Sequence, residues 1–130
     1  MSTDAEAVVT AFFKAMGPPY ANCRKGWEEF LTEDAVWQNS GFPDCNGKLE
    51  CLAFLDGFAS QTGLDSLQVE MLNISASGRS VLTERIDYFK NADGETIAPL
   101  PLMGVLEVRE GEIALWHDYF DPRPLLGSGS

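Results

Sequence analysis

Two aspartates and one arginine stand out, because each lies in a segment with the alternating pattern of a β-strand. Arg85 and Asp87 lie two residues apart within 80–90, and Asp118 lies within 112–120. Alternate side chains of a strand point to the same face, so Arg85 and Asp87 share one. Because a guanidinium can bond two carboxylates at once, the sequence predicts a pair of carboxylates linked by an arginine.

The neighbours of these charges indicate a buried face. Phe89 shares the face of Asp87, and Trp116 and Phe120 share that of Asp118. If exposed, these aromatics would form a costly apolar patch. Pattern alone leaves the alternative open, since many amphipathic strands turn their charges to water. The opposite face is apolar as well, and is a candidate dimer surface; it comprises Leu82, Ile86, Leu115 and Tyr119.

Periodicity and turn signals predict the elements that must position these residues. Helices are expected up to about Met16, from an Asn22 cap to about Leu31, and from Gly47 to about Gly63. The predicted strands span 35–39, 67–76, 80–90, 96–109 and 112–120. Helices followed by hairpin strands indicate an α+β domain in which the helices pack on one antiparallel sheet.

Length and composition fit one compact domain with its own core. The chain has 130 residues, of which 45% are hydrophobic, with 3 Trp and 8 Phe. A chain of this size buries about two thirds of the surface that it exposes when unfolded. We expect a single domain over residues 1–126. The Gly-Ser-Gly-Ser end at 127–130 has the composition of a flexible tail or an engineered remnant.

Charge and cysteine content narrow the expected partners. A formal net charge of −11, from 20 Asp+Glu against 9 Lys+Arg, repels phosphate backbones and anionic lipids, so neither nucleic acid nor a membrane is expected. Three cysteines and one histidine form no evident disulfide framework or zinc site, and no metal or cofactor is predicted. Without an apolar run of ~20 residues or the features of a signal peptide, the expected location is the cytoplasm.

Three short motifs carry a family resemblance. They are Trp37-Gln38-Asn39, Thr83-Glu84-Arg85-Ile86-Asp87 and Trp116-His117-Asp118-Tyr119-Phe120-Asp121. Together they resemble the limonene-1,2-epoxide hydrolase family, one of the cone-shaped folds that include nuclear transport factor 2, ketosteroid isomerase and SnoaL-like cyclases. The resemblance covers nearly the whole chain. It implies an NTF2-like cone, in which a curved antiparallel sheet and N-terminal helices enclose a deep pocket, and a homodimer formed through the outer sheet face.

The resemblance also implies a reaction, the one-step hydrolysis of an epoxide to a vicinal diol without metal, cofactor or covalent intermediate. Asp118 is then expected to take a proton from water, and Asp87 to protonate the epoxide oxygen. Arg85 is expected to bridge the two, and Asn39 to orient the water. Such chemistry needs one neutral and one ionised carboxyl, which an enclosed site can provide. Positioned acid and base groups each contribute on the order of 10²–10⁴ in rate.

Trp37 departs from the family pattern, which usually has a tyrosine two residues before the asparagine. An indole N–H donates but cannot accept a hydrogen bond, so Trp37 either donates to the water or only shapes the pocket. His117 adjoins the expected base, but strand alternation turns it to the other face. The remaining expected lining residues are Trp116, Phe58, Phe89, Leu100, Leu102 and Phe120. Such an apolar lining suits a small cyclic or terpene-like epoxide.

Two other functions remain open at this point. A ketosteroid isomerase or SnoaL-like enzyme would also use a pocket carboxylate, but without an arginine that links an acid to a base. A non-catalytic ligand-binding module would retain the cavity and lose turnover, and the Trp37 departure favours it. The Arg85–Asp87 spacing, together with Asp118, favours hydrolysis.

Overall fold

The computed structural model describes residues 2–125, so the predicted tail at 127–130 lies outside the described residues. The helices are α1 (Ser2–Lys14), α2 (Tyr20–Phe30) and α3 (Lys48–Thr62). The strands are β1 (Leu31–Asn39), β2 (Cys45–Asn46), β3 (Leu64–Ser77), β4 (Ser80–Asn91), β5 (Thr96–Arg109) and β6 (Glu112–Tyr119), and the 3₁₀ turn η1 (Arg123–Leu125) follows them. The expected α+β class is confirmed.

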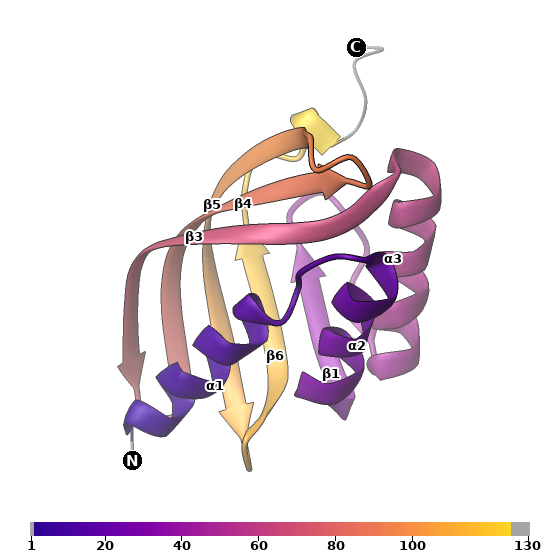
Figure 1. The fold of residues 1–130 in the computed structure, drawn as a ribbon. Coiled ribbons are helices and arrows are strands. Elements are labelled where there is room, and N and C mark those ends of the chain that lie inside the picture. Colours follow the sequence, from indigo (N-terminus) through magenta and orange to yellow (C-terminus); the bar gives the residue numbers. More distant parts are fainter. Residues whose placement is uncertain (1, 126–130) are drawn as a thin grey trace.

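The six strands form one curved sheet in the order β2-β1-β6-β5-β4-β3. Tight hairpins join β3 to β4, β4 to β5 and β5 to β6 (Figure 1). Strand β1 lies on the free side of β6. The β1–β6 pair is parallel, whereas the other pairs are antiparallel. The expectation of a purely antiparallel sheet is therefore wrong at this pair, because α3 and three hairpin strands lie between β1 and β6 along the chain.

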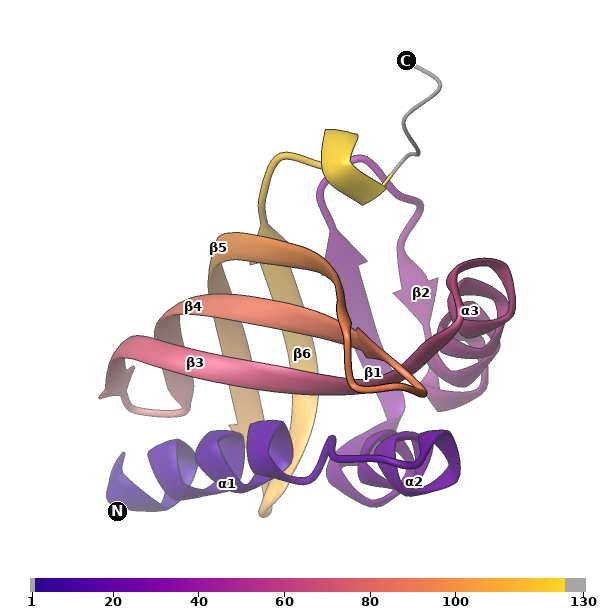
Figure 2. The same ribbon diagram turned by 45° about the horizontal axis from the view of Figure 1, so that its top comes forward.

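The three helices lie on the concave side of the sheet. Figure 2 shows α1 and α2 in a row along one side of the curved strands, with α3 beside β1 and β2 and η1 at the opposite end. Phe12 of α1 is fully buried and packs edge-on against Trp27 of α2 and Trp116 of β6, with ring centroids 5.7 and 5.0 Å apart. The core therefore lies between the helices and the inner sheet face.

Burial alternates along the two central strands and identifies that inner face. On β4, Thr83, Arg85 and Asp87 are buried, whereas Leu82, which precedes them and points to the other face, is 47% exposed. On β5 every second residue from Ala98 to Val108 is buried. The prediction that the charged face of these strands points inward is confirmed, and the alternative in which the charges face water is wrong.

Two helix boundaries differ from the sequence expectation. Helix α1 ends at Lys14 because Pro18, four residues later, has no N–H to donate to the Lys14 carbonyl. The Met16 carbonyl accepts a hydrogen bond from the Leu67 N–H of β3 instead, at 2.9 Å. Helix α2 begins at Tyr20, directly after Pro19, and the Asn22 side chain donates to the Gly17 carbonyl without capping the helix. Among the described residues, no helix is long and apolar enough to span a membrane.

Candidate active site

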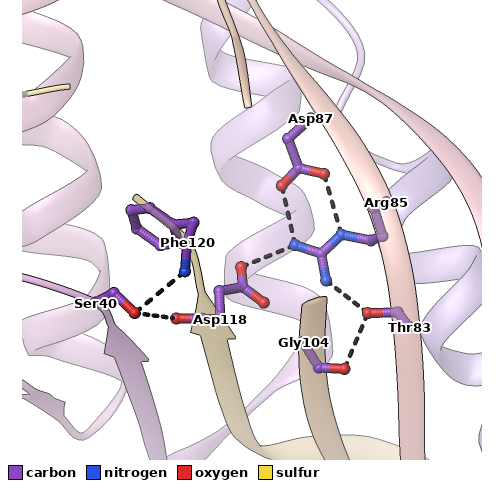
Figure 3. A network of polar contacts seen from close by, with 7 residues as sticks. All are labelled: Ser40, Thr83, Arg85, Asp87, Gly104, Asp118 and Phe120. Atoms are coloured by element: carbon purple, nitrogen blue, oxygen red, sulfur yellow. Dashed lines mark hydrogen bonds and ion pairs between the residues drawn. The ribbon is translucent and has the colours of Figure 1, made fainter. Parts of the chain in front are cut away.

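Strand register brings the predicted charged residues to one place on the inner face. Thr83 of β4 lies opposite Gly104 of β5, and Gly104 lies opposite Asp118 of β6. Arg85 and Asp87 follow Thr83 on the same face of β4. The side chain of Arg85 reaches across β5 to Asp118, as Figure 3 shows. The sheet therefore assembles a cluster from residues that are 33 positions apart in sequence.

The guanidinium of Arg85 makes four hydrogen bonds to three side chains (Figure 3). Its Nε and Nη2 donate to the two oxygens of Asp87, each at 3.0 Å. The same Nη2 donates to Asp118 Oδ2 at 2.8 Å, and Nη1 donates to Thr83 Oγ1 at 3.0 Å. Asp87 thus receives two bonds and Asp118 one, while Asp118 Oδ1 has no hydrogen-bond partner among the described residues.

The cluster is removed from water. Arg85 is 0% exposed, Asp118 3% and Asp87 5%. The ring of Phe13, on α1, covers the guanidinium plane, with its centroid 4.2 Å from the Arg85 carbon Cζ. A buried ion pair is tolerated when its geometry is good and its polar groups are hydrogen-bonded, and four of the five N–H groups of this guanidinium donate to a side chain.

Burial and mutual charge set the protonation of the cluster. Removal from water raises the pKa of Asp118 above its ordinary value of 3.8; Arg85 opposes this rise and the charge of Asp87 adds to it. Burial alone would lower the pKa of Arg85, but the two carboxylates outweigh it and hold that pKa above its ordinary value. The arginine therefore stays charged, and Asp118 keeps its proton to a higher pH than an exposed aspartate.

The parallel β1–β6 pair forms the second wall of the site. Trp37 is the register partner of Trp116, and Asn39 is the partner of Asp118. Partners on neighbouring strands are separated by about the strand spacing of 4.7–4.9 Å, and the two indoles accordingly stack 4.7 Å apart at an interplanar angle of 15°. The same pairing places Asn39 beside Asp118.

Ser40 fixes the end of this pair. Its N–H and its hydroxyl both donate to the Asp118 carbonyl, at 3.2 and 3.4 Å, and its hydroxyl accepts from the Phe120 N–H at 3.2 Å. These backbone bonds hold the segment that carries Asp118 against the end of β1 (Figure 3). The sequence offered no signal for this role, since Ser40 follows the predicted strand as an ordinary turn residue.

A cavity of about 60 Å³ lies between the two walls. Both carboxylates line it, and Arg85 lies behind them. Every predicted lining residue is part of its wall: Trp37, Asn39, Phe58, Phe89, Leu100, Leu102, Trp116 and Phe120. The sequence reasoning missed the other lining residues, which are Trp27, Phe42, Phe54, Leu55, Leu64, Leu67 and Leu125. Of these, Phe54 could have been found, because it precedes Phe58 by one helical turn on α3.

The two remaining aromatic predictions have different outcomes. The Trp37 indole nitrogen is buried and has no hydrogen-bond partner among the described residues, so its N–H is not committed to another protein group and both roles predicted for Trp37 stay open. His117 stacks on Tyr119 at 4.0 Å, and Tyr119 is 53% exposed on the outer sheet face. His117 therefore points away from the carboxylates, as strand alternation predicts.

Within the described residues no group of three metal-binding side chains gathers.

Comparison with known proteins identifies the family of this chain. The model of the limonene-1,2-epoxide hydrolase catalytic domain matches residues 3–128. The chain belongs to the limonene-1,2-epoxide hydrolase family. It is 36% identical over 95 residues to epoxide hydrolase EphG of Mycobacterium tuberculosis (strain ATCC 25618 / H37Rv), a match that covers 70% of this chain and 58% of that protein. The match thus spans less than two thirds of that relative's length.

Solved structures show the same fold. An M. tuberculosis LEH-like epoxide hydrolase is similar with a TM-score of 0.75 at 29% identity, over 96% of this chain and 84% of that one. A putative SnoaL-like polyketide cyclase from Jannaschia sp. CCS1 also has a TM-score of 0.75, at 15% identity, over 96% of this chain and 90% of that one. The second likeness concerns the fold alone, which this chain thus shares with a SnoaL-like protein.

Proposed function

We propose that this member of the limonene-1,2-epoxide hydrolase family adds water to a small apolar epoxide to give a vicinal diol. The observation that carries the proposal is the single guanidinium that donates to both cavity carboxylates. This arrangement holds an acid and a base on one side of a cavity whose other lining residues, apart from Asn39, are apolar or aromatic. It suits a reaction that must remove one proton and supply another.

In the proposed reaction Asp118 is the base and Asp87 the acid. Asp118 takes a proton from water as the water oxygen attacks an epoxide carbon, the carbon–oxygen bond breaks, and the departing oxygen takes the proton of Asp87. Two features support this assignment: the unbonded Oδ1 of Asp118, and Asn39, which lies beside Asp118 and can orient the water. A raised pKa also makes ionised Asp118 a stronger base than an exposed aspartate.

Each turnover moves one proton from Asp87 to Asp118. In the product state Asp118 is neutral, which is the form that its burial favours. The site must therefore return the proton before the next attack. Arg85 lowers the energy of either ionised carboxylate, because its Nη2 donates to both.

The cavity favours the smaller epoxides of the cyclic and terpene-like class. Its volume of about 60 Å³ is below the roughly 150 Å³ of a cavity known to hold benzene. The stacked Trp37 and Trp116 form part of one wall. A terpene epoxide would therefore require this wall or the aromatic mouth to move, whereas a slim epoxide needs less displacement.

The alternatives predict other outcomes. A ketosteroid isomerase or SnoaL-like reaction has no need for an arginine that joins two carboxylates, and the Jannaschia likeness at 15% identity concerns the fold. A ligand-binding module would retain small apolar molecules without converting them. We keep hydrolysis as the proposal because Arg85, Asp87 and Asp118 form one bonded cluster.

The proposal includes a homodimer formed through the outer sheet face, in the cytoplasm. On that face Leu82, Met103 and Tyr119 are 47%, 53% and 53% exposed, and large exposed apolar residues on neighbouring strands are typical of an interface. The three cysteines are free thiols, as expected in a reducing compartment. The molar mass measured by light scattering should be that of a dimer for the wild type and that of a monomer for Leu82→Lys. A monomeric wild type contradicts this part of the proposal.

Turnover of purified protein tests the proposed activity. We expect diol from 1,2-epoxybutane and cyclohexene oxide in the presence of EDTA, at a rate above that of buffer, with limonene oxide slower. A folded protein that yields no diol from any of these contradicts the proposal. Binding of the epoxides without conversion would favour the non-catalytic module.

A further inference from the structure

Arg85 crosses β5 at a residue that has no side chain. Arg85 lies on β4 and Asp118 on β6, and the residue of β5 in register with Asp118 is Gly104. A Cβ at Gly104 would lie 2.2 Å from Asp118 Oδ1 and 2.8 Å from Arg85 Nη1, so both side chains would have to move. Gly104 is not one of the glycines with a positive φ. The site thus needs glycine here for space and not for backbone freedom.

Thr83 holds the remaining end of the guanidinium. Its hydroxyl donates to the Gly104 carbonyl at 3.1 Å and accepts from Arg85 Nη1 at 3.0 Å. A hydroxyl has a single proton, so donation to Gly104 turns the oxygen lone pairs toward Arg85. Thr83 is 1% exposed and its branched side chain has few rotamers. The hydroxyl is therefore a fixed acceptor.

We infer that Thr83 and Gly104 are positioning residues of this site. Gly104 provides the space in which the guanidinium reaches Asp118. Thr83 fixes the plane of the guanidinium, so that Nη2 donates one hydrogen bond to Asp87 and one to Asp118. Without the Thr83 hydroxyl, Nη1 loses its acceptor and Arg85 can pivot on its two bonds to Asp87, away from Asp118. The kinetic consequence rests on the proposed function, whereas the geometric one holds for any role of the cluster.

Thr83→Val tests the hydroxyl, because valine keeps the shape of threonine and removes the oxygen. We expect kcat to fall on the order of 10–100-fold with KM little changed, since small misplacement of a catalytic group has effects of this size. The acidic limb of the pH–rate profile should move to higher pH, because a displaced Arg85 opposes the raised pKa of Asp118 less. Thr83→Ser, which keeps the hydroxyl, should retain most of the rate and the wild-type profile.

Thr32→Val is the matched control. Thr32 is 6% exposed and its hydroxyl donates to a carboxylate, that of Asp34, at 2.8 Å, but neither residue lines the cavity. This variant should lose some stability and keep the wild-type kcat and pH–rate profile. A Thr83→Val enzyme that likewise changes only in stability would overturn the inference.

Nuclear magnetic resonance of Arg85 separates this inference from the proposed activity. Hydrogen bonds that fix a guanidinium slow the rotation about its C–N bonds, so that its Nη groups give separate signals. The wild type should therefore show separate Nη signals for Arg85, and in Thr83→Val these signals should be broadened or merged. If these signals change but no epoxide is hydrolysed by the wild type, the proposed function fails and the positioning role stands. Unchanged Arg85 signals in Thr83→Val contradict the positioning role, whatever the activity.

Alanine variants test the space at Gly104. Gly104→Ala should lose most of its activity, whereas Gly57→Ala is the control, because a Cβ at Gly57 on α3 meets nothing within 4 Å. A folded Gly104→Ala variant with wild-type turnover and wild-type Arg85 signals would contradict the spatial argument. If Gly104→Ala does not fold, the threonine variants decide the inference.

Discussion

The two walls of the cavity are held together in different ways. On the β4–β6 wall, Arg85 makes four directional bonds, and its charge is matched by two carboxylates. On the second wall, called the β1 wall here, Trp27 of α2, Trp37 of β1 and Trp116 of β6 pack ring to ring with centroids 4.7–5.9 Å apart. None of their indole nitrogens has a hydrogen-bond partner in the part of the chain that the structure describes. The first wall thus depends on bond geometry and the second on packing.

This difference suggests a division of labour. Directional bonds allow one arrangement of the charged groups, as a proton-transfer site requires. A wall of packed aromatic rings can instead be altered by substitution, which changes the shape of the cavity at a cost in stability alone. Changes to the first wall should therefore alter the rate for every substrate. Changes to the second wall should alter which substrates are accepted.

The largest effect is expected from the carboxylates. Asp118→Asn and Asp87→Asn should each lower kcat on the order of 10²–10⁴-fold, because an amide can neither accept the water proton nor supply one to the epoxide. Single-turnover rates with cyclohexene oxide measure the loss. Asp56→Asn is the matched control, since Asp56 pairs with Arg24 outside the cavity and its loss should leave the rate unchanged. A near wild-type rate in either site variant would remove that residue from the reaction.

The next effect concerns stability. Arg85→Met removes the cation between two buried carboxylates, and breaking a buried ion pair by removing one partner costs about 3–5 kcal/mol. Urea unfolding at pH 7 should show this loss. At pH 4 the loss should be smaller, because carboxylates that lack a cation take up protons. An equal loss at the two pH values would argue against an electrostatic origin.

A smaller effect is expected on the packed wall. Trp37→Leu should raise kcat/KM for limonene oxide relative to 1,2-epoxybutane by roughly 10-fold, in the range that pocket shape alone provides. Trp37→Phe distinguishes the two roles left open for Trp37, since phenylalanine keeps a ring and removes the N–H. If the indole donates to the water, Trp37→Phe should slow all epoxides alike; if Trp37 only shapes the wall, the ratio between substrates should change.

The smallest effect is the dependence of stability on pH. Above pH 3.8 the folded state keeps the proton of Asp118 while the unfolded state loses it, because burial raises the folded pKa. The contribution of Asp118 is thus complete below that pH and is lost as pH rises through the raised pKa. The free energy of unfolding of the wild type, minus that of Asp118→Asn, should fall with increasing pH over this range. A difference that rises with pH would contradict the raised pKa.

The polar wall was predictable from sequence, because its signal is local. Arg85 and Asp87 share a face by alternation, and Phe89, Trp116 and Phe120 indicated that the face is buried. All the predicted lining residues reach the cavity. The family followed from the three short motifs, and the α+β class followed from the periodicity of the helices and strands.

The β1 wall was less predictable, because it depends on contacts between distant segments. Parallel pairing of β1 with β6 stacks Trp37 on Trp116, and nothing near Trp37 in sequence specifies its partner strand. The role of Gly104 likewise appears only when β4, β5 and β6 are in register. Three lining residues that the sequence did not predict, Phe42, Phe54 and Leu125, lie on three separate segments.

The origin of the added oxygen is the most direct test of the central claim that the carboxylates act on water by proton transfer. A single turnover of cyclohexene oxide with excess enzyme in ¹⁸O-labelled water should place the label in the diol. A diol that instead carries unlabelled oxygen, with ¹⁸O appearing in Asp87 or Asp118, would show a covalent ester intermediate and contradict the account.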